Sequence, residues 1–211
     1  MYTIVCFGDT NTWGYDEFTG DRLPFEKRWT GVLSIELGQN YRVIEEGLCG
    51  RTTVQDDPVE TFKNGKTYLI PCLDSHKPIN MLVLMLGQVN LKTRFSFTAQ
   101  DIALGMEEIV KISLLSRCGI KNSPPKILLT SPVRVGPLKG TPMEAWFPVT
   151  TSESRSMELP RLYKNIADKY GIHFLDVSSV AETSFDGIHI ANRSHKPFGE
   201  VLARLVREIV Q

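Results

Sequence analysis

Short apolar runs alternate along the chain with longer segments in which apolar residues recur at helical spacing, and this alternation restricts the fold more than any other feature. The strongest run, Ile79–Leu86, has Asn80 as its one polar member and stops at Gly87. Strands alternating with helices predict βαβ units and a mostly parallel sheet, and continuous apolar strands predict helices on both faces. The other predicted strands are Tyr2–Phe7, Arg42–Ile44, Lys126–Thr130 and Ile172–Val177.

Helices are predicted between these strands. Thr98 is the expected N-cap of the longest one. Pro71 should break one helix and Pro160 should kink or interrupt another, because proline removes a backbone donor. The predicted helical segments are Trp29–Leu37, Gly65–Ser75, Thr98–Cys118, Ser152–Tyr170 and Ser194–Val210.

Composition excludes several classes of protein. The 211 residues fit one domain, residues 1–211, and 42% hydrophobic with 23% charged residues is typical of a globular chain rather than a disordered one. Lys and Arg together number 24 and so do Asp and Glu, giving a formal net charge of +0. This balance argues against a nucleic-acid partner, although a local basic patch is compatible with it.

The sequence also bears on compartment and cofactors. No segment reaches the ~18 consecutive apolar residues of a membrane span, and the N-terminal run into Gly8 is typical of a strand rather than a signal peptide. The scattered cysteines form no CxxC pair, which favours reduced thiols in the cytoplasm. His76 and His173 lack metal-ligand spacing to any partner, so no metal and no cofactor are expected.

The loop Gly8–Gly14 is the first candidate site, because ligands of parallel α/β sheets bind outside the carboxyl ends of the strands. Gly8 permits a sharp turn, after which the Thr10 hydroxyl would lie near backbone donors able to stabilise an oxyanion. A simple helix cap, with Asp9 or Thr10 satisfying unpaired donors, explains the same residues. Both interpretations are open from this motif alone.

The second candidate is the loop before the last helix, Phe185–His189. Asp186 stands three residues before His189 and can accept its Nδ1–H, which leaves Nε2 free to take a proton from a hydroxyl. The same spacing occurs by chance in surface turns. The position of the loop, after the last strand, predicts that it lies at the same edge of the sheet as Thr10.

These motifs together resemble the GDSL/SGNH hydrolase family over essentially the whole chain, and the similarity is greatest to its arylesterase/acyltransferase branch. The resemblance implies a three-layer α/β/α sandwich with a five-stranded, mostly parallel, flavodoxin-like sheet. It also implies a serine-type esterase acting on a small-molecule ester. The stretches that carry it are Trp29–Leu33, Val43–Leu48, Arg51–Thr53, Asp56–Pro58, Asp101–Met106 and Asp186–His189.

Carried over to this sequence, the resemblance implies that His189 is the general base, Asp186 its orienting carboxylate and Gly50 a backbone donor of the oxyanion hole. Three further positions depart from the family. Thr10 occupies the place of the nucleophilic serine, which also supplies a backbone donor to the oxyanion. Val89 occupies the place of the oxyanion asparagine, and the aspartate after it is replaced by Asn90.

The departures carry a physical cost. A threonine hydroxyl can be a nucleophile when a base activates it, but its methyl group restricts χ1. Valine donates no hydrogen bond, and losing one oxyanion donor typically costs ~2.7–4 kcal/mol. The amides of Gln88 and Asn90 would compensate only if the loop were shifted by one residue.

Three hypotheses remain. The favoured one is a weak or specialised esterase for short-acyl or aryl esters, with acyl transfer to alcohols, because Gly50, Asp186 and His189 stay in register. The second is a catalytically impaired relative that binds an acyl or carbohydrate ligand. The lowest-ranked is a flavin-phosphate binder, since hydroxyls after a first strand also cradle phosphate in flavodoxin-like proteins.

Some residues are expected to support the site. Asp9 and Asn11 would shape the turn before the first helix. Arg51 would bind a carboxylate, buttress the site loop through Asn90, or form an ordinary loop salt bridge. The segment Pro132–Pro148 is predicted to be a lid, a binding loop or an interface. Because related enzymes of the branch are oligomers, the resemblance implies a homo-oligomer.

Overall fold

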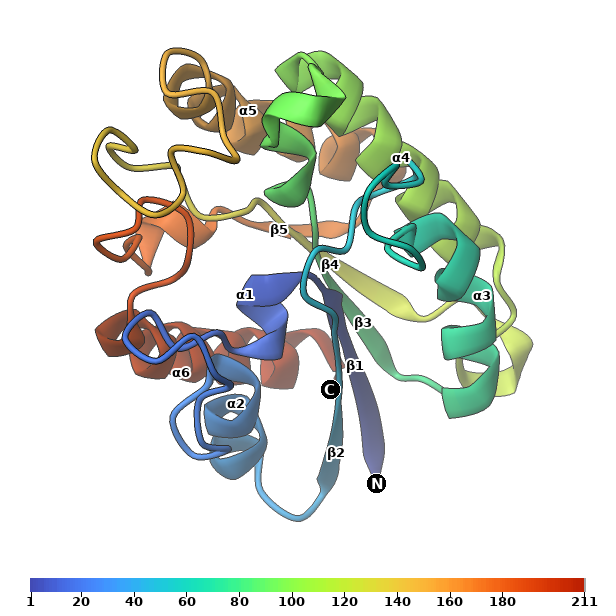
Figure 1. Ribbon diagram of the computed structural model, residues 1–211. Helices are drawn as coiled ribbons and strands as arrows, with labels where there is room; N and C mark the ends of the chain where they lie inside the picture. The colour runs from blue at the N-terminus through green and yellow to red at the C-terminus, as the bar shows by residue number, and fades with distance from the viewer. Residues whose placement is uncertain (211) are drawn as a thin grey trace.

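The computed structural model describes residues 1–210, which form a five-stranded parallel sheet with helices on both faces (Figure 1). The strand order is β2-β1-β3-β4-β5, and every pairing is parallel. This is the flavodoxin-like order, so the predicted fold is confirmed. The strands are β1 (Tyr2–Gly8), β2 (Tyr41–Gly47), β3 (Met81–Met85), β4 (Lys126–Thr130) and β5 (His173–Leu175).

The helices cover the two faces of the sheet in separate layers, with α2 and α6 on one side and α3, α4 and α5 on the other (Figure 1). Strand β3 contributes side chains to the hydrophobic cores on both faces of the sheet, because successive side chains of a strand point to opposite faces. Leu82 and Leu84 belong to the α3–α4–α5 core, whereas Met81 and Val83 belong to the α2–α6 core. The helices are α1 (Thr10–Trp13), α2 (Trp29–Leu37), α3 (Gly65–His76), α4 (Ala99–Leu115), α5 (Ser152–Tyr170) and α6 (Asn192–Val210).

The predicted break at Pro71 and the predicted interruption at Pro160 were wrong. Helix α3 continues through Pro71 and α5 continues through Pro160. Fully buried core side chains lie close to each proline in the sequence, Leu73 after Pro71 and Leu159 before Pro160. Their burial offsets the ~3 kcal/mol that an interior proline costs a helix. Thr98 caps α4 as predicted.

Two glycines allow α1 to sit directly on the ends of the strands. Gly8 and Gly47 are paired residues at the ends of β1 and β2. A Cβ atom on Gly47 would lie 2.2 Å from the backbone nitrogen of Trp13, and one on Gly8 would lie 2.0 Å from Thr12 Oγ1. The missing side chains therefore bring the first residues of α1 beside the loop that follows β2.

Asp9 is the N-cap of α1, and its carboxylate accepts a hydrogen bond of 3.0 Å from the backbone nitrogen of Asn11. The residue is only 1% exposed. Burial raises its pKa to about 6, against the lowering influence of the Asn11 N–H and of His189 and Arg51. Asp9 therefore caps the helix as expected, and its carboxyl group is buried in doing so.

None of the helices within residues 1–210 combines the length and the apolar character that a membrane crossing requires.

We predict that Gly47→Ala lowers the free energy of unfolding by about 1–3 kcal/mol, because the new methyl group would collide with backbone atoms of α1. Gly136→Ala is the matched control, since its Cβ would lie 3.1 Å from the Thr183 hydroxyl and 3.5 Å from the Gly187 Cα, with no closer backbone contact. Urea unfolding of both variants measures the difference. Equal losses in the two variants would contradict the proposed contact.

We also predict that Asp9→Asn flattens the pH dependence of stability between about pH 4 and pH 6. The folded-state pKa of Asp9 is raised to about 6, so in this window the native state binds more protons than the unfolded state. The wild type therefore loses stability as the pH rises, by about 3 kcal/mol for a shift of about two pKa units. Asparagine keeps the cap. Urea unfolding across this range should show no such slope in the variant, and identical slopes would contradict the assignment.

Candidate active site

Thr10 begins α1 at the carboxyl end of β1, and its hydroxyl meets the loop that follows β2. The backbone nitrogen of Gly50 donates a hydrogen bond of 3.2 Å to Thr10 Oγ1. Gly50 has φ +80, a left-handed conformation that favours glycine, and a Cβ here would lie 2.8 Å from Glu60 Oε2. A hydroxyl and a backbone donor from two separate loops are thus brought into contact.

Asp186 and His189 form the predicted pair within one short loop. His189 Nδ1 lies 2.6 Å from Asp186 Oδ2, and Asp186 Oδ1 accepts the backbone N–H groups of Ile188 (2.8 Å) and His189 (2.9 Å). Burial alone would raise the pKa of Asp186, but the bonds from His189 and the backbone outweigh it and hold that pKa well below its usual value. Asp186 is therefore ionised, and a proton held on Nδ1 leaves Nε2 as the free nitrogen.

Tyr15 supports the imidazole from one face. Its ring stacks on His189 with 4.1 Å between the ring centroids and an interplanar angle of 29°. The ring of His189 is consequently restrained by a carboxylate at Nδ1 and by an aromatic face.

Asn11 ties the two loops together across most of the sequence. Its Oδ1 accepts the backbone N–H of Ile190 at 2.8 Å, and its carbonyl oxygen accepts the indole N–H of Trp29 at 2.9 Å. The side chain of Gln88 makes a similar link, since Nε2 donates to the carbonyl of Ile188 at 3.2 Å. Both side chains thus bond to backbone atoms of the loop that carries His189.

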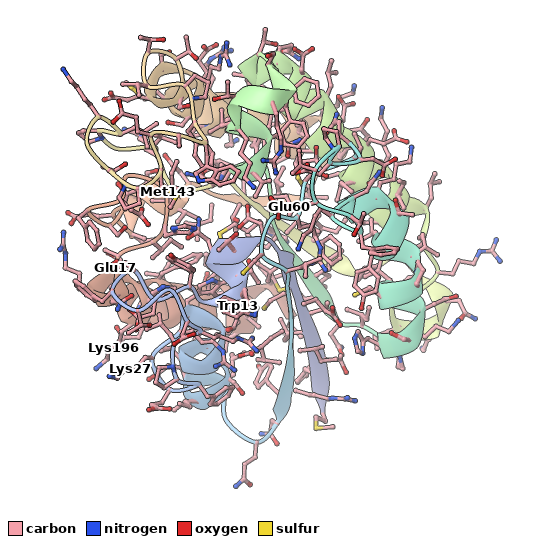
Figure 2. The ribbon with its side chains drawn as sticks, in the orientation of Figure 1. Trp13, Glu17, Lys27, Glu60, Met143 and Lys196 are labelled. Atoms are coloured by element: carbon pink, nitrogen blue, oxygen red, sulfur yellow. The ribbon has the colours of Figure 1, made fainter. Side chains whose placement is uncertain are left out.

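Thr10, Gly50 and His189 line one cavity of about 210 Å³ outside the carboxyl ends of the strands. Figure 2 labels Glu60 and Met143, which come from the segments after β2 and β4 and belong to the same wall. The complete lining is Asp9, Thr10, Asn11, Cys49, Gly50, Glu60, Gln88, Val89, Lys92, Met143, Trp146, Phe147, Ile188 and His189.

The segment between β4 and α5 supplies the apolar part of this wall through Met143, Trp146 and Phe147. Trp146 lies near two cations, with Lys92 Nζ 5.9 Å and the Arg94 guanidinium carbon 5.8 Å from its ring centroid. The segment predicted as a lid, binding loop or interface thus forms a cavity wall within one chain.

An ionic cluster at the cavity was missed by sequence reasoning. Glu60 Oε1 accepts from Lys92 Nζ (3.0 Å) and from Arg94 Nη2 (2.6 Å), and Arg94 also pairs with Asp57. Burial tends to raise the pKa of Glu60, but the bonds from the two cations lower it overall. No motif marks these residues, because their charges meet only after the loops have folded together.

The two departures around Val89 have different consequences. The side chain of Val89 lines the cavity and offers no donor. The side chain of Asn90 is committed elsewhere, since Oδ1 accepts from the backbone of Thr53 at 3.0 Å and Nδ2 donates to Gln55 Oε1 at 2.8 Å. Asn90 does not line the cavity, and the amide of Gln88, which does, already donates to the carbonyl of Ile188.

Arg51 buttresses the site through backbone atoms. Its Nη1 donates to the carbonyl oxygens of Gly8, at 2.9 Å, and of Glu46. The guanidinium also lies over the ring of Phe7, 4.2 Å from its centroid. The expected route through Asn90 and the expected salt bridge were both wrong within residues 1–210, because carbonyl groups at the strand ends accept the guanidinium donors instead.

Comparisons with known proteins place the chain in a family. No family model matches it, and no curated protein does. A solved structure titled Est24, a carbohydrate acetylesterase from Sinorhizobium meliloti, is 34% identical with a TM-score of 0.93, over 99% of this chain and 100% of that one. The inhibitor-bound aryl esterase of M. smegmatis is 38% identical with a TM-score of 0.92, over 99% and 100%.

A more distant structure, the lipase/acylhydrolase from Enterococcus faecalis, is 16% identical with a TM-score of 0.70 over 99% of this chain and 96% of that one, and shares the fold. With 34% and 38% identity to the two esterases over nearly the whole length of each chain, the protein belongs to the GDSL/SGNH hydrolase family.

Proposed function

We propose that this protein hydrolyses carboxylic esters with short acyl groups, aryl esters among them, and that Thr10 is the nucleophile. The observation that carries the proposal is the shared cavity, in which the Thr10 hydroxyl contacts the Gly50 N–H and His189 is braced by Asp186. The two similar structures, a carbohydrate acetylesterase and an aryl esterase, support the substrate class.

The proposed reaction begins when His189 Nε2 takes the proton of the Thr10 hydroxyl and Oγ1 attacks the acyl carbon. The carbonyl oxygen becomes an oxyanion, which the N–H groups of Gly50 and Thr10 stabilise. Collapse of this intermediate expels the alcohol, which leaves with the proton from His189, and forms an acyl ester on Thr10.

Water completes the cycle. His189 takes a proton from the water, which attacks the acyl ester and releases the acid and the Thr10 hydroxyl. An alcohol that competes with water would accept the acyl group by the same steps, which is the acyl transfer expected from the sequence.

The size of the cavity supports a short acyl group. Pockets for drug-sized ligands run ~300–1,000 Å³, whereas this one measures about 210 Å³. Met143, Phe147 and Ile188 give it an apolar wall, while Glu60 and Lys92 add charged groups. A small acyl chain with a polar or aromatic leaving group matches this lining.

Val89 supports a second candidate function, a relative with impaired catalysis that binds an acyl or carbohydrate ligand. The family position of the asparagine donor carries an apolar side chain, and the nearby amides of Gln88 and Asn90 are engaged in other bonds. In this case the cavity would hold a ligand without appreciable turnover.

We predict that wild-type protein hydrolyses p-nitrophenyl acetate and that Thr10→Val and His189→Ala abolish the activity. Thr10→Ser removes the methyl group and should raise kcat, by up to about 100-fold if the methyl displaces the attacking oxygen by ~1 Å. Thr12→Val is the matched control, because the buried Thr12 hydroxyl has no hydrogen-bond partner and does not line the cavity. Activity that survives in Thr10→Val would rule out Thr10 as the nucleophile.

We predict that Val89→Asn raises kcat by roughly 10²–10³, the value of one oxyanion donor. Val89→Leu has a similar shape to asparagine without the donor, so it separates hydrogen bonding from packing and should not raise kcat. If only the double variant Thr10→Ser/Val89→Asn turns over substrate, the impaired-relative hypothesis is correct. If no variant does, the proposed substrate class is wrong.

A further inference from the structure

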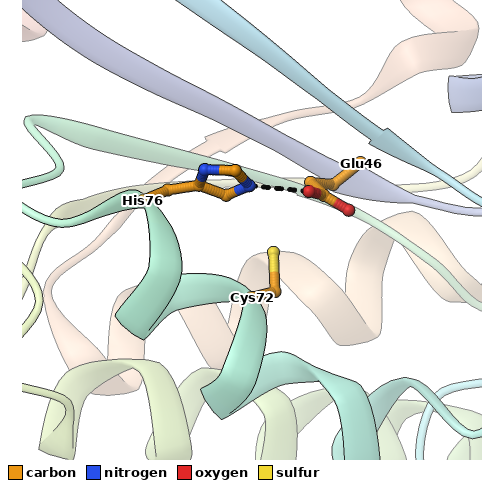
Figure 3. A group of neighbouring side chains, drawn as sticks. All are labelled: Glu46, Cys72 and His76. Carbon is orange, nitrogen blue, oxygen red and sulfur yellow. Dashed lines mark hydrogen bonds and ion pairs between the residues drawn. The ribbon is translucent and has the colours of Figure 1, made fainter.

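A second group of reactive side chains lies outside the cavity, where β2 meets α3 (Figure 3). His76 Nε2 lies 2.7 Å from Glu46 Oε1. Cys72 is fully buried, and its Sγ points toward this pair in Figure 3. One sulfur, one nitrogen and one oxygen from these residues all lie within 4.8 Å of one another.

The sequence spacing explains how the three side chains converge. Cys72 and His76 are four residues apart on α3 and therefore share one face of the helix. Glu46 is the penultimate residue of β2, the edge strand against which that face lies. The helical spacing therefore brings two of the side chains together, and packing of the helix beside the strand adds the third.

We propose that Glu46, Cys72 and His76 bind a zinc ion. Zinc takes Cys sulfur at ~2.3 Å, His nitrogen at ~2.0–2.1 Å and carboxylate oxygen at ~2.0–2.2 Å, and a thiolate–imidazole pair disfavours Mg²⁺ and Ca²⁺. In a tetrahedral site these ligand atoms lie about 3.3–3.6 Å apart. Small side-chain rotations therefore suffice, separating the Glu46–His76 pair slightly and drawing the sulfur closer.

The surroundings favour a bound cation in two ways. Tyr68 donates from its hydroxyl to Glu46 Oε2 at 3.2 Å, an outer contact that orients the carboxylate. Glu46 and Tyr68 also line a cavity of about 710 Å³, which gives an ion a route to the cluster. Three protein ligands leave the fourth position for water.

Arg51 is a positive group that acts on this cluster, since it opposes the rise in the pKa of the Cys72 thiol that burial and Glu46 cause. Zinc binds the thiolate, so a bound ion must displace the thiol proton.

A bound ion would link β2 to α3 through Glu46, which stands four residues before Gly50. The loop that contains Gly50 follows directly after β2. The proposal does not depend on the proposed ester hydrolysis, since none of its three ligands lines the active-site cavity.

Cobalt titration tests the proposal without using activity. Protein stripped with a chelator should bind Co²⁺ stoichiometrically and develop sulfur-to-cobalt charge-transfer absorption in the near ultraviolet, which Zn²⁺ then abolishes by displacement. Cys72→Ser and His76→Ala should each lower the affinity for Co²⁺ at least ~100-fold. This loss is larger than the one expected from removing a residue that only contacts a metal ligand. Cys118→Ser and His173→Ala are matched controls, a buried thiol and an exposed imidazole outside the cluster, and should behave as wild type.

Circular dichroism establishes that each variant is folded. If Cys72→Ser does not fold, the wild-type titration decides alone: saturable charge-transfer absorption at one Co²⁺ per chain supports the site. Absence of cobalt uptake by the wild type, or absorption that a folded Cys72→Ser retains, would overturn the proposal and leave a hydrogen-bonded cluster only.

Discussion

The geometry of the candidate site depends on the close backbone contact between α1 and the end of β2. Gly47 has no side chain, so the backbone of Trp13 approaches it closely, and the first turn of α1 lies against the edge strand. Gly50 follows three residues later, and its N–H reaches the Thr10 hydroxyl. Arg51 fixes the same strand ends through the carbonyls of Gly8 and Glu46. A hydroxyl and a backbone donor are thereby held together before any substrate binds.

The sequence predicted well what local patterns determine. Apolar runs located all five strands, and the three-residue spacing of Asp186 and His189 predicted their contact because both lie in one loop. The prolines were misjudged because burial outweighed a lost hydrogen bond. Contacts between distant segments were beyond prediction: Asn11 with Ile190 and Glu60 with Lys92 depend on how whole loops pack. The grouping of Glu46 with Cys72 and His76 likewise requires a strand and a helix to be placed side by side.

Two opposing features set the proposed activity. The imidazole of His189, held by Asp186, and the donor at Gly50 favour acyl transfer. Thr10 and Val89 oppose it in the proposed mechanism, one through the methyl group beside the nucleophilic oxygen and the other through the loss of a donor worth ~2.7–4 kcal/mol. The proposed slow esterase differs from a binding protein by one chemical event, the transfer of an acyl group to a threonine oxygen.

Covalent trapping detects that event most directly. Incubation with a p-nitrophenyl phosphonate, followed by peptide mass spectrometry, should show release of p-nitrophenol and a single phosphonyl adduct on Thr10. The adduct should be lost in His189→Ala, because the hydroxyl then has no base. Ester turnover with the adduct on another residue, or with no adduct at all, would contradict the assignment of Thr10 as the nucleophile.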